Sequence, residues 1–181
     1  MARIISNFFI SLDGVVEAPD QWHFAYWNDE MGAVVEAGMR DQAAMLMGRR
    51  LYEEWSAYWT TTGEDQDVAA IINGTPKYVL STTLEKADWT NTTLVTGDVA
   101  ATLRELKERL DGNIQMSGSA TTVRWLLANG LLDELRLLVH PIAVGRGQRL
   151  FEDTPTHPLK LVRSETFQTG VLHLTYTPDT D

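Results

Sequence analysis

Three short turns in the sequence carry groups that can bind phosphate. They are Gly48-Arg49-Arg50, Ser81-Thr82-Thr83 and Ser117-Gly118-Ser119, and each follows a short apolar run. A turn between a strand and a helix leaves the first backbone N–H groups of the helix free to donate to an anion. An arginine pair at a helix start is poorly placed for the helix dipole unless an anion lies there. These turns predict a phosphate-binding crevice.

Each turn alone also has an ordinary structural explanation. An arginine pair is usually a solvated surface, and Ser-Thr-Thr is common turn and cap chemistry. Ser117-Gly118-Ser119 matches neither the G-x-G-x-x-G nor the Walker pattern. The combination is more informative, because a dinucleotide with a 2′-phosphate needs helix-end amides together with guanidinium and hydroxyl groups.

Other catalytic chemistry is sparse in this sequence. The histidines show no ligand spacing and there is no cysteine, so we predict no metal site; they are His23, His140, His157 and His173. No Gly-x-Ser-x-Gly elbow is present for a hydrolase nucleophile. Asp13 is the best candidate for a catalytic carboxylate, and a structural role as the turn residue after the first strand explains it at least as well.

The long loop over residues 14–27 is rich in aromatic side chains and is expected to cover a ligand or a partner. Trp22 and Tyr26 in this loop, with Trp55 further along the chain, are candidates for the substrate pocket. Ordinary core packing is the alternative for each.

Hydrophobic periodicity and turn signals predict the elements that position these residues. Strands are expected over 3–12, 43–47, 77–81, 92–95, 114–116, 134–139, 160–167 and 171–177, helices over 28–39, 51–58, 98–110 and 121–129, and a polar surface loop over 60–67. Asn28 and Asp98 are the predicted N-caps. The order predicts one α/β domain, residues 1–181: a mixed, mainly parallel sheet flanked by helices, with a C-terminal antiparallel hairpin. Ligands of such sheets bind beyond the carboxyl ends of the strands.

Charge and composition narrow the partners. With 25 acidic and 15 basic side chains the formal net charge is −10, which disfavours nucleic acids and anionic membrane surfaces. No apolar run is long enough to span a membrane and no secretory signal is evident, so we expect a cytoplasmic protein that acts on a small molecule.

Four motifs resemble one family. MGRRLYEEW at 47–55 resembles a helix start of the dihydrofolate reductase fold, and LSTT at 80–83 resembles its second phosphate-contact turn. The stretch 117–151 is more similar to the reductase, C-terminal domain of the bifunctional riboflavin-biosynthesis deaminase-reductase, and SLDG at 11–14 completes the pattern. The chain thus resembles the dihydrofolate reductase-like superfamily.

The resemblance implies an NADPH-dependent reductase, usually a homodimer, that transfers a hydride to a small heterocyclic or carbonyl substrate, as 5-amino-6-(5-phosphoribosylamino)uracil reductase does. It implies nicotinamide near Leu12, Asp13 and Leu51, with substrate under the 14–27 loop. The cofactor residues that it implies are Gly48, Arg49, Arg50, Leu51, Ser81, Thr82, Gly118, Ser119, Ala120 and Thr121.

The sequence also departs from the family pattern. It has no cysteines for the zinc site of a deaminase domain, so the riboflavin-pathway substrate does not carry over directly. No inward-facing carboxylate is evident on the first helix, so folate is not supported. A non-catalytic nucleotide-binding or regulatory protein is the alternative function. The apolar run 135–144 suggests a dimer contact near a sheet edge, and a central strand covered by helices is the alternative.

Overall fold

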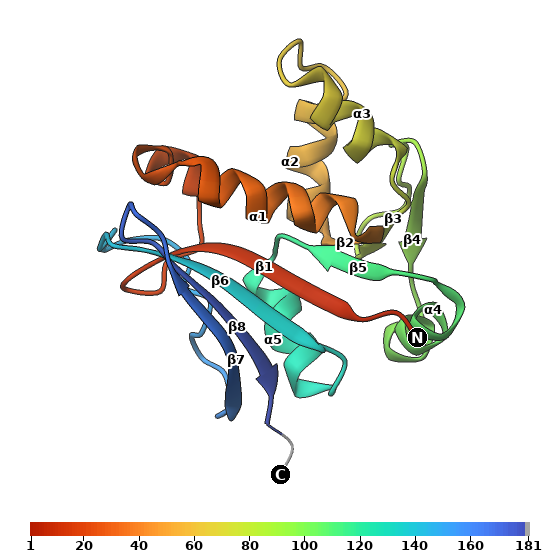
Figure 1. Ribbon diagram of the computed structural model, residues 1–181. Helices are drawn as coiled ribbons and strands as arrows, with labels where there is room; N and C mark the ends of the chain where they lie inside the picture. The colour runs from red at the N-terminus through yellow and green to blue at the C-terminus, as the bar shows by residue number, and fades with distance from the viewer. Residues whose placement is uncertain (180–181) are drawn as a thin grey trace.

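The computed structural model describes residues 1–179, and the last two residues of the predicted domain lie outside the described part (Figure 1). The strands are β1 (Ile4–Ser11), β2 (Gln42–Gly48), β3 (Lys77–Leu80), β4 (Thr92–Val95), β5 (Asn113–Met116), β6 (Glu134–His140), β7 (Leu159–Thr166) and β8 (Leu172–Pro178). The helices are α1 (Asp29–Arg40), α2 (Arg49–Trp59), α3 (Gln66–Gly74), α4 (Val99–Arg109) and α5 (Ala120–Ala128), with 3-10 turns η1 (Pro19–Gln21) and η2 (Phe24–Tyr26).

The strands form one eight-stranded sheet in the order β4-β3-β2-β5-β1-β6-β8-β7. Strands β1 to β6 pair in parallel, whereas β8 pairs antiparallel with both β6 and β7. The predicted mixed, mainly parallel sheet with a C-terminal antiparallel hairpin is confirmed. The carboxyl ends of the six parallel strands therefore share one edge of the sheet.

Helices cover both faces of the sheet (Figure 1). On one face α4 and α5 bury a single continuous apolar cluster against β1, β2, β5 and β6. On the other face the apolar contacts form two separate clusters, one under α2 and α3 and one under α1. We call this second side the α1/α2 face.

The helix starts follow local sequence signals. Asn28 caps α1 by accepting from the Met31 amide at 3.0 Å, and Asp98 caps α4 by accepting from the Ala101 amide at 3.0 Å. Both predicted N-caps are confirmed. Helix α5 begins one residue earlier than predicted, at Ala120, with Ser119 as its cap.

Helix α3 was not predicted, and the predicted polar loop 60–67 overlaps its first residues. Its N-cap, Asp65, makes no side-chain cap hydrogen bond. The helix is instead held at its carboxyl end by Lys77, whose Nζ donates to the carbonyls of Asn73, Thr75 and Thr90. Lys77 is fully buried, with Nζ 4.5 Å from the Trp89 ring centroid, and burial lowers its pKa to about 8. A tertiary contact thus supplies what the local sequence lacks.

The apolar run 135–144 does not lie at a sheet edge. Its strand, β6, lies between β1 and β8, so the covered-strand alternative is the correct one and the edge interpretation was wrong. The edge on that side is β7, where the apolar side chains of Leu161 and Val162 are exposed. The C-terminal hairpin, rather than β6, offers an uncovered strand.

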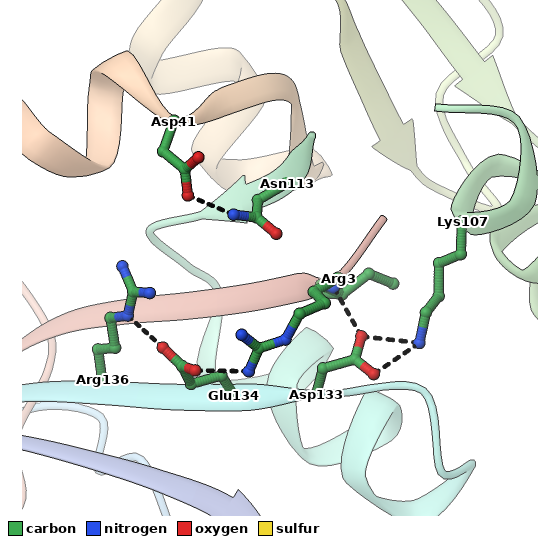
Figure 2. Close-up of polar contacts among 8 residues, drawn as sticks. Arg3, Asp41, Lys107, Asn113, Asp133, Glu134 and Arg136 are labelled. Carbon is green, nitrogen blue, oxygen red and sulfur yellow. Dashed lines mark hydrogen bonds and ion pairs between the residues drawn. The ribbon is translucent and has the colours of Figure 1, made fainter. Parts of the chain in front are cut away.

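Charged side chains fasten the amino ends of the central strands (Figure 2). Glu134, which is buried, accepts from Arg3 at 2.5 Å and also from Arg136. Asp133 accepts from the Ile4 amide at 2.7 Å and from Lys107 Nζ at 2.8 Å. These contacts join β1, β6 and α4 at the edge opposite the predicted site.

Candidate functional site

Two neighbouring strands send their helices to opposite faces of the sheet. Strand β2 continues directly into α2 on one face, and β5 continues through a short turn into α5 on the other. Adjacent parallel strands with diverging connections leave a crevice beyond their carboxyl ends, where ligands of open α/β sheets bind. The amino termini of α2 and α5 therefore meet at this crevice.

The two helix starts lie in close contact. A Cβ atom on Gly48 would lie 2.9 Å from Thr122 Oγ1 and 3.3 Å from Ser119 Oγ, and one on Gly118 would lie 3.6 Å from Leu51 Cδ2. A side chain at position 48 would thus press on the first turn of α5. The structure brings together Gly48, Leu51, Gly118 and Ser119, as the sequence motifs predicted.

The electrostatics of the crevice suit an anion. Neither α2 nor α5 has an acidic residue in its first turn, although such residues would complement the helix dipole. Helix α2 instead begins with the exposed Arg49 and Arg50, and Arg49 Nη1 lies 3.5 Å from Glu53 Oε1. The first amides of α5, at Ala120 and Thr121, have no acceptor within the helix. These groups fit the phosphates of a dinucleotide.

The third predicted turn lies at the same edge of the sheet. Leu80 at the end of β3 pairs in register with Gly48, so Ser81 and Thr82 follow immediately beyond the crevice. Ser81 Oγ accepts from the amides of Thr83 at 3.1 Å and Leu84 at 2.9 Å, which fixes the turn. Thr82 is exposed and available to a ligand.

Asp13 lies at the carboxyl end of β1, in a network that fastens two loops. Its carboxylate accepts from Ser11 Oγ at 2.6 Å and from the amides of Val144 at 3.0 Å and Gly145 at 2.8 Å. The Ser11 hydrogen bond, followed by the two amides, lowers the pKa of Asp13 to about 2. This geometry is that of a structural turn residue, the alternative considered from the sequence. Neighbouring Leu12 is exposed.

The aromatic candidates fall into two groups. Trp22 and Tyr26 lie edge-on to His140 at the end of β6, with ring centroids 5.2 and 5.7 Å away. Trp55 lies elsewhere, in the cluster under α2, with its ring 6.1 Å from that of Trp59.

The loop 14–27 also rests on aromatic residues that the sequence analysis did not select. Phe9 of β1 stacks on His23 at 4.5 Å and lies 6.5 Å from Trp27. Burial lowers the pKa of His23 and of His140. Phe9 lies inside a strand, and only the pairing of the strands shows which face it occupies.

Other possible sites lie away from the crevice. Two surface grooves, of about 290 and 540 Å³, lie between β4 and α4 and between α1 and β7. Neither groove is lined by a residue that the sequence analysis selected. Over residues 1–179, no group of three or more histidine, aspartate or glutamate side chains is arranged to hold a metal ion, and no helix is long and apolar enough to cross a membrane.

Comparisons with known proteins show what this chain is similar to. The family model described as the RibD C-terminal domain matches residues 2–173. The uncharacterized protein YyaP of Bacillus subtilis (strain 168) is 28% identical over 180 residues, which are 96% of this chain and 94% of that protein.

Two solved structures share the fold. A putative riboflavin biosynthesis protein from Shewanella sp. PV-4 superposes with a TM-score of 0.78 at 22% identity, covering 99% of each chain. Dihydrofolate reductase from Enterococcus faecalis, complexed with NADP(H) and RAB-propyl, superposes with a TM-score of 0.64 at 12% identity, covering 98% of this chain and 96% of that one.

Proposed function

We propose, from the premise that this chain belongs to the RibD C-terminal domain family, that it is an NADPH-dependent reductase of a small heterocyclic or carbonyl compound. One observation carries the proposal: the helix starts of α2 and α5 meet so closely at Gly48 that only glycine fits without displacing a neighbour. Such a crevice offers backbone amides from α5 and guanidinium groups from α2 to one elongated phosphate ligand.

Six of the ten predicted cofactor residues have a role that their position supports. The amides of Ala120 and Thr121 would hold the pyrophosphate, with Ser119 capping the helix that presents them. Arg49 would pair with the 2′-phosphate in place of its half-exposed contact with Glu53. Ser81 and Thr82 would line the adenosine side, beyond the end of β3.

Bound NADPH supplies a hydride, which carries two electrons and one proton. The substrate carbon gains the hydride, and the adjacent nitrogen or oxygen takes a proton from water. The protein would place the substrate beside the crevice and exclude bulk water. We assign this role to the 14–27 loop, because its Trp22 and Tyr26 pack against His140 at the end of β6. 5-Amino-6-(5-phosphoribosylamino)uracil is one candidate substrate, because the family resemblance implies it and the similar Shewanella protein is named a putative riboflavin biosynthesis protein.

A titration tests the proposal. NADPH should quench the fluorescence of the tryptophans on saturable binding, and candidate pteridine, imine and carbonyl compounds should then be screened for oxidation of NADPH. Turnover with any of them supports a reductase. Saturable binding with no turnover across the screen favours the non-catalytic nucleotide-binding alternative, and no binding at all refutes the proposed cofactor.

We also propose that the protein is a homodimer, as the family resemblance implies. The exposed edge strand β7, with Leu161 and Val162 uncovered, is the surface that a second copy would cover.

A further inference from the structure

A polar pair lies in the middle of the sheet on the α1/α2 face. Asn7 Nδ2 donates to Gln115 Oε1 at 2.7 Å. Asn7 belongs to β1, which lies between β5 and β6, and Gln115 belongs to β5, which lies between β2 and β1. Interior strands covered on both faces are normally apolar, so two carboxamides here need an explanation.

The apolar contacts on this face are interrupted at the pair. On the same face, Met45 and Met47 belong to the cluster under α2 and α3, whereas Phe9 and Leu138 belong to the cluster under α1. The two clusters share no residue, and the strand pairing places the polar pair between them. Asn7 is accordingly only half-buried, although it lies on an interior strand.

The pair has unused hydrogen-bonding groups. Gln115 is 5% exposed and its Nε2 group has no partner within the described residues, 1–179. Asn7 Oδ1 likewise receives no hydrogen bond from that part of the chain. A buried donor without an acceptor costs free energy and is uncommon, so it indicates a missing partner. The pair therefore has one donor and one acceptor that the described residues leave unused.

A third polar group adjoins the pair. Arg136 pairs in register with Asn7 across β1 and β6. Its Nε donates to the buried Glu134, and its terminal nitrogens point away from that carboxylate (Figure 2). The guanidinium is thus held toward Glu134 at the amino ends of the strands, and it takes no part in the recognition proposed below.

Flat aromatic surfaces stand beside the polar groups. Phe9 follows Asn7 by two residues on the same face of β1, and Trp27 lies 6.5 Å from Phe9 between their ring centroids. The Trp27 ring lies 3.7 Å from where a Cβ of Gly32 would be, so it packs against α1 where that helix has no side chain. Aromatic walls over a polar floor suit a planar ring.

The polar floor, formed by Asn7 and Gln115, adjoins the cofactor crevice. Ser6 pairs in register with Met116, the last residue of β5, so Asn7 lies level with Ser117, the residue before Gly118. We infer that Asn7 and Gln115 are specificity-determining residues that hydrogen-bond the edge of a planar ring carrying an N–H group next to a carbonyl. This assignment of a substrate edge rests on the proposed reductase function.

Two ring compounds test the inference. Lumazine has the required edge, and 1,3-dimethyllumazine has the same ring system without its N–H groups. Each is titrated into the wild-type protein with and without NADP⁺, and binding is followed by quenching of tryptophan fluorescence. Lumazine should bind about 10-fold or more tightly than its dimethyl analogue, the size expected for one hydrogen bond to a buried group.

Three variants test whether Asn7 and Gln115 cause the difference in affinity between the two compounds. Gln115→Leu and Asn7→Leu should reduce the ratio of the two affinities to near one, while NADP⁺ affinity is unchanged. Gln115→Glu keeps the shape and replaces the donor by an acceptor, so it should weaken lumazine further, and it also covers the case in which a leucine variant fails to fold. Gln66→Leu, at an exposed position on α3, is the matched control and should behave as wild type.

The outcomes separate this inference from the proposed function. Equal affinities of wild type for the two compounds, no binding of lumazine, or retained discrimination in folded Gln115→Leu would each overturn the assignment while NADPH binding stands. Failure of NADPH to bind refutes the proposed function, and the titrations without nucleotide still decide the role of the floor.

Discussion

Replacing Gly48 by alanine probes the close approach of α2 and α5 with a single added methyl group. Gly48 has φ −81°, so alanine adopts its backbone conformation without strain. The new Cβ would lie 2.9 Å from Thr122 Oγ1, about 0.5 Å closer than an ordinary contact allows. The first turn of α5 must then move, which should cost about 1–3 kcal/mol of unfolding free energy.

The same movement should weaken cofactor binding. The displaced turn carries the amides proposed to hold the pyrophosphate, so the loss of one good hydrogen bond, about 1.5 kcal/mol, corresponds to a roughly 10-fold rise in the Kd for NADPH. Urea unfolding measures the stability, and quenching of tryptophan fluorescence by NADPH measures the Kd.

Two further variants make this test specific. Gly38→Ala lies in α1 with nothing within 4 Å of its new methyl, so it should leave NADPH binding unchanged and stabilise the helix by about 0.5–1 kcal/mol. Thr122→Ala removes the clashing oxygen, so Gly48→Ala combined with Thr122→Ala should regain part of both losses. Unchanged NADPH affinity in folded Gly48→Ala would refute the idea that the cofactor lies at this contact.

Three other predictions follow from buried or uncovered groups. Lys77→Met should destabilise the protein by roughly 1–3 kcal/mol in urea unfolding, because three carbonyls lose their buried donor; unchanged stability would contradict this role. Burial lowers the pKa of His23 and His140, so below a pH of about 6.5 the unfolded chain binds more protons than the folded protein does. Lowering the pH from about 7 to about 5 should therefore lower the stability, and His140→Phe should make thermal melts less dependent on pH. Light scattering should give twice the chain mass of 20.3 kDa, and Leu161→Lys on β7 should reduce it; a wild-type mass of one chain would rule out the dimer.

Local signals in the sequence predicted much of the fold. The caps Asn28 and Asp98, which the structure confirms, could be predicted because an N-cap accepts from an amide two or three residues away. The whole interaction therefore lies within a few positions of the sequence. Helix α3 was missed because Lys77 holds it through carbonyls of three separate residues, a contact that no periodicity encodes.

The candidate site, like the fold, could be predicted from the sequence only in part. Gly48 and Gly118 belong to motifs that mark turns, so the sequence alone selects them, whereas only the fold shows that Gly48 faces Ser119 and Gly118 faces Leu51. Asn7 and Gln115 are separated by 108 positions in the sequence, and each alone is an unremarkable polar residue in a strand. Only the order of β2, β5, β1 and β6 in the sheet brings them together between two apolar clusters. Sequence patterns selected the three turns proposed to bind phosphate, and they could not select Asn7 and Gln115.

The central claim, that this crevice binds NADPH, is tested most directly by titrating NADPH and NADH against wild type and Arg49→Ala. Because only NADPH carries the 2′-phosphate, Arg49→Ala should weaken NADPH by about 1.5–3 kcal/mol, roughly 10- to 150-fold, and leave NADH nearly unchanged. Arg40→Ala is the matched control, since Arg40 forms the same i,i+4 pair, with Glu36, on α1, and both nucleotides should bind it as they bind wild type. Equal losses for both nucleotides in Arg49→Ala would remove Arg49 from the 2′-phosphate site, and a wild-type protein that binds neither nucleotide would contradict the account.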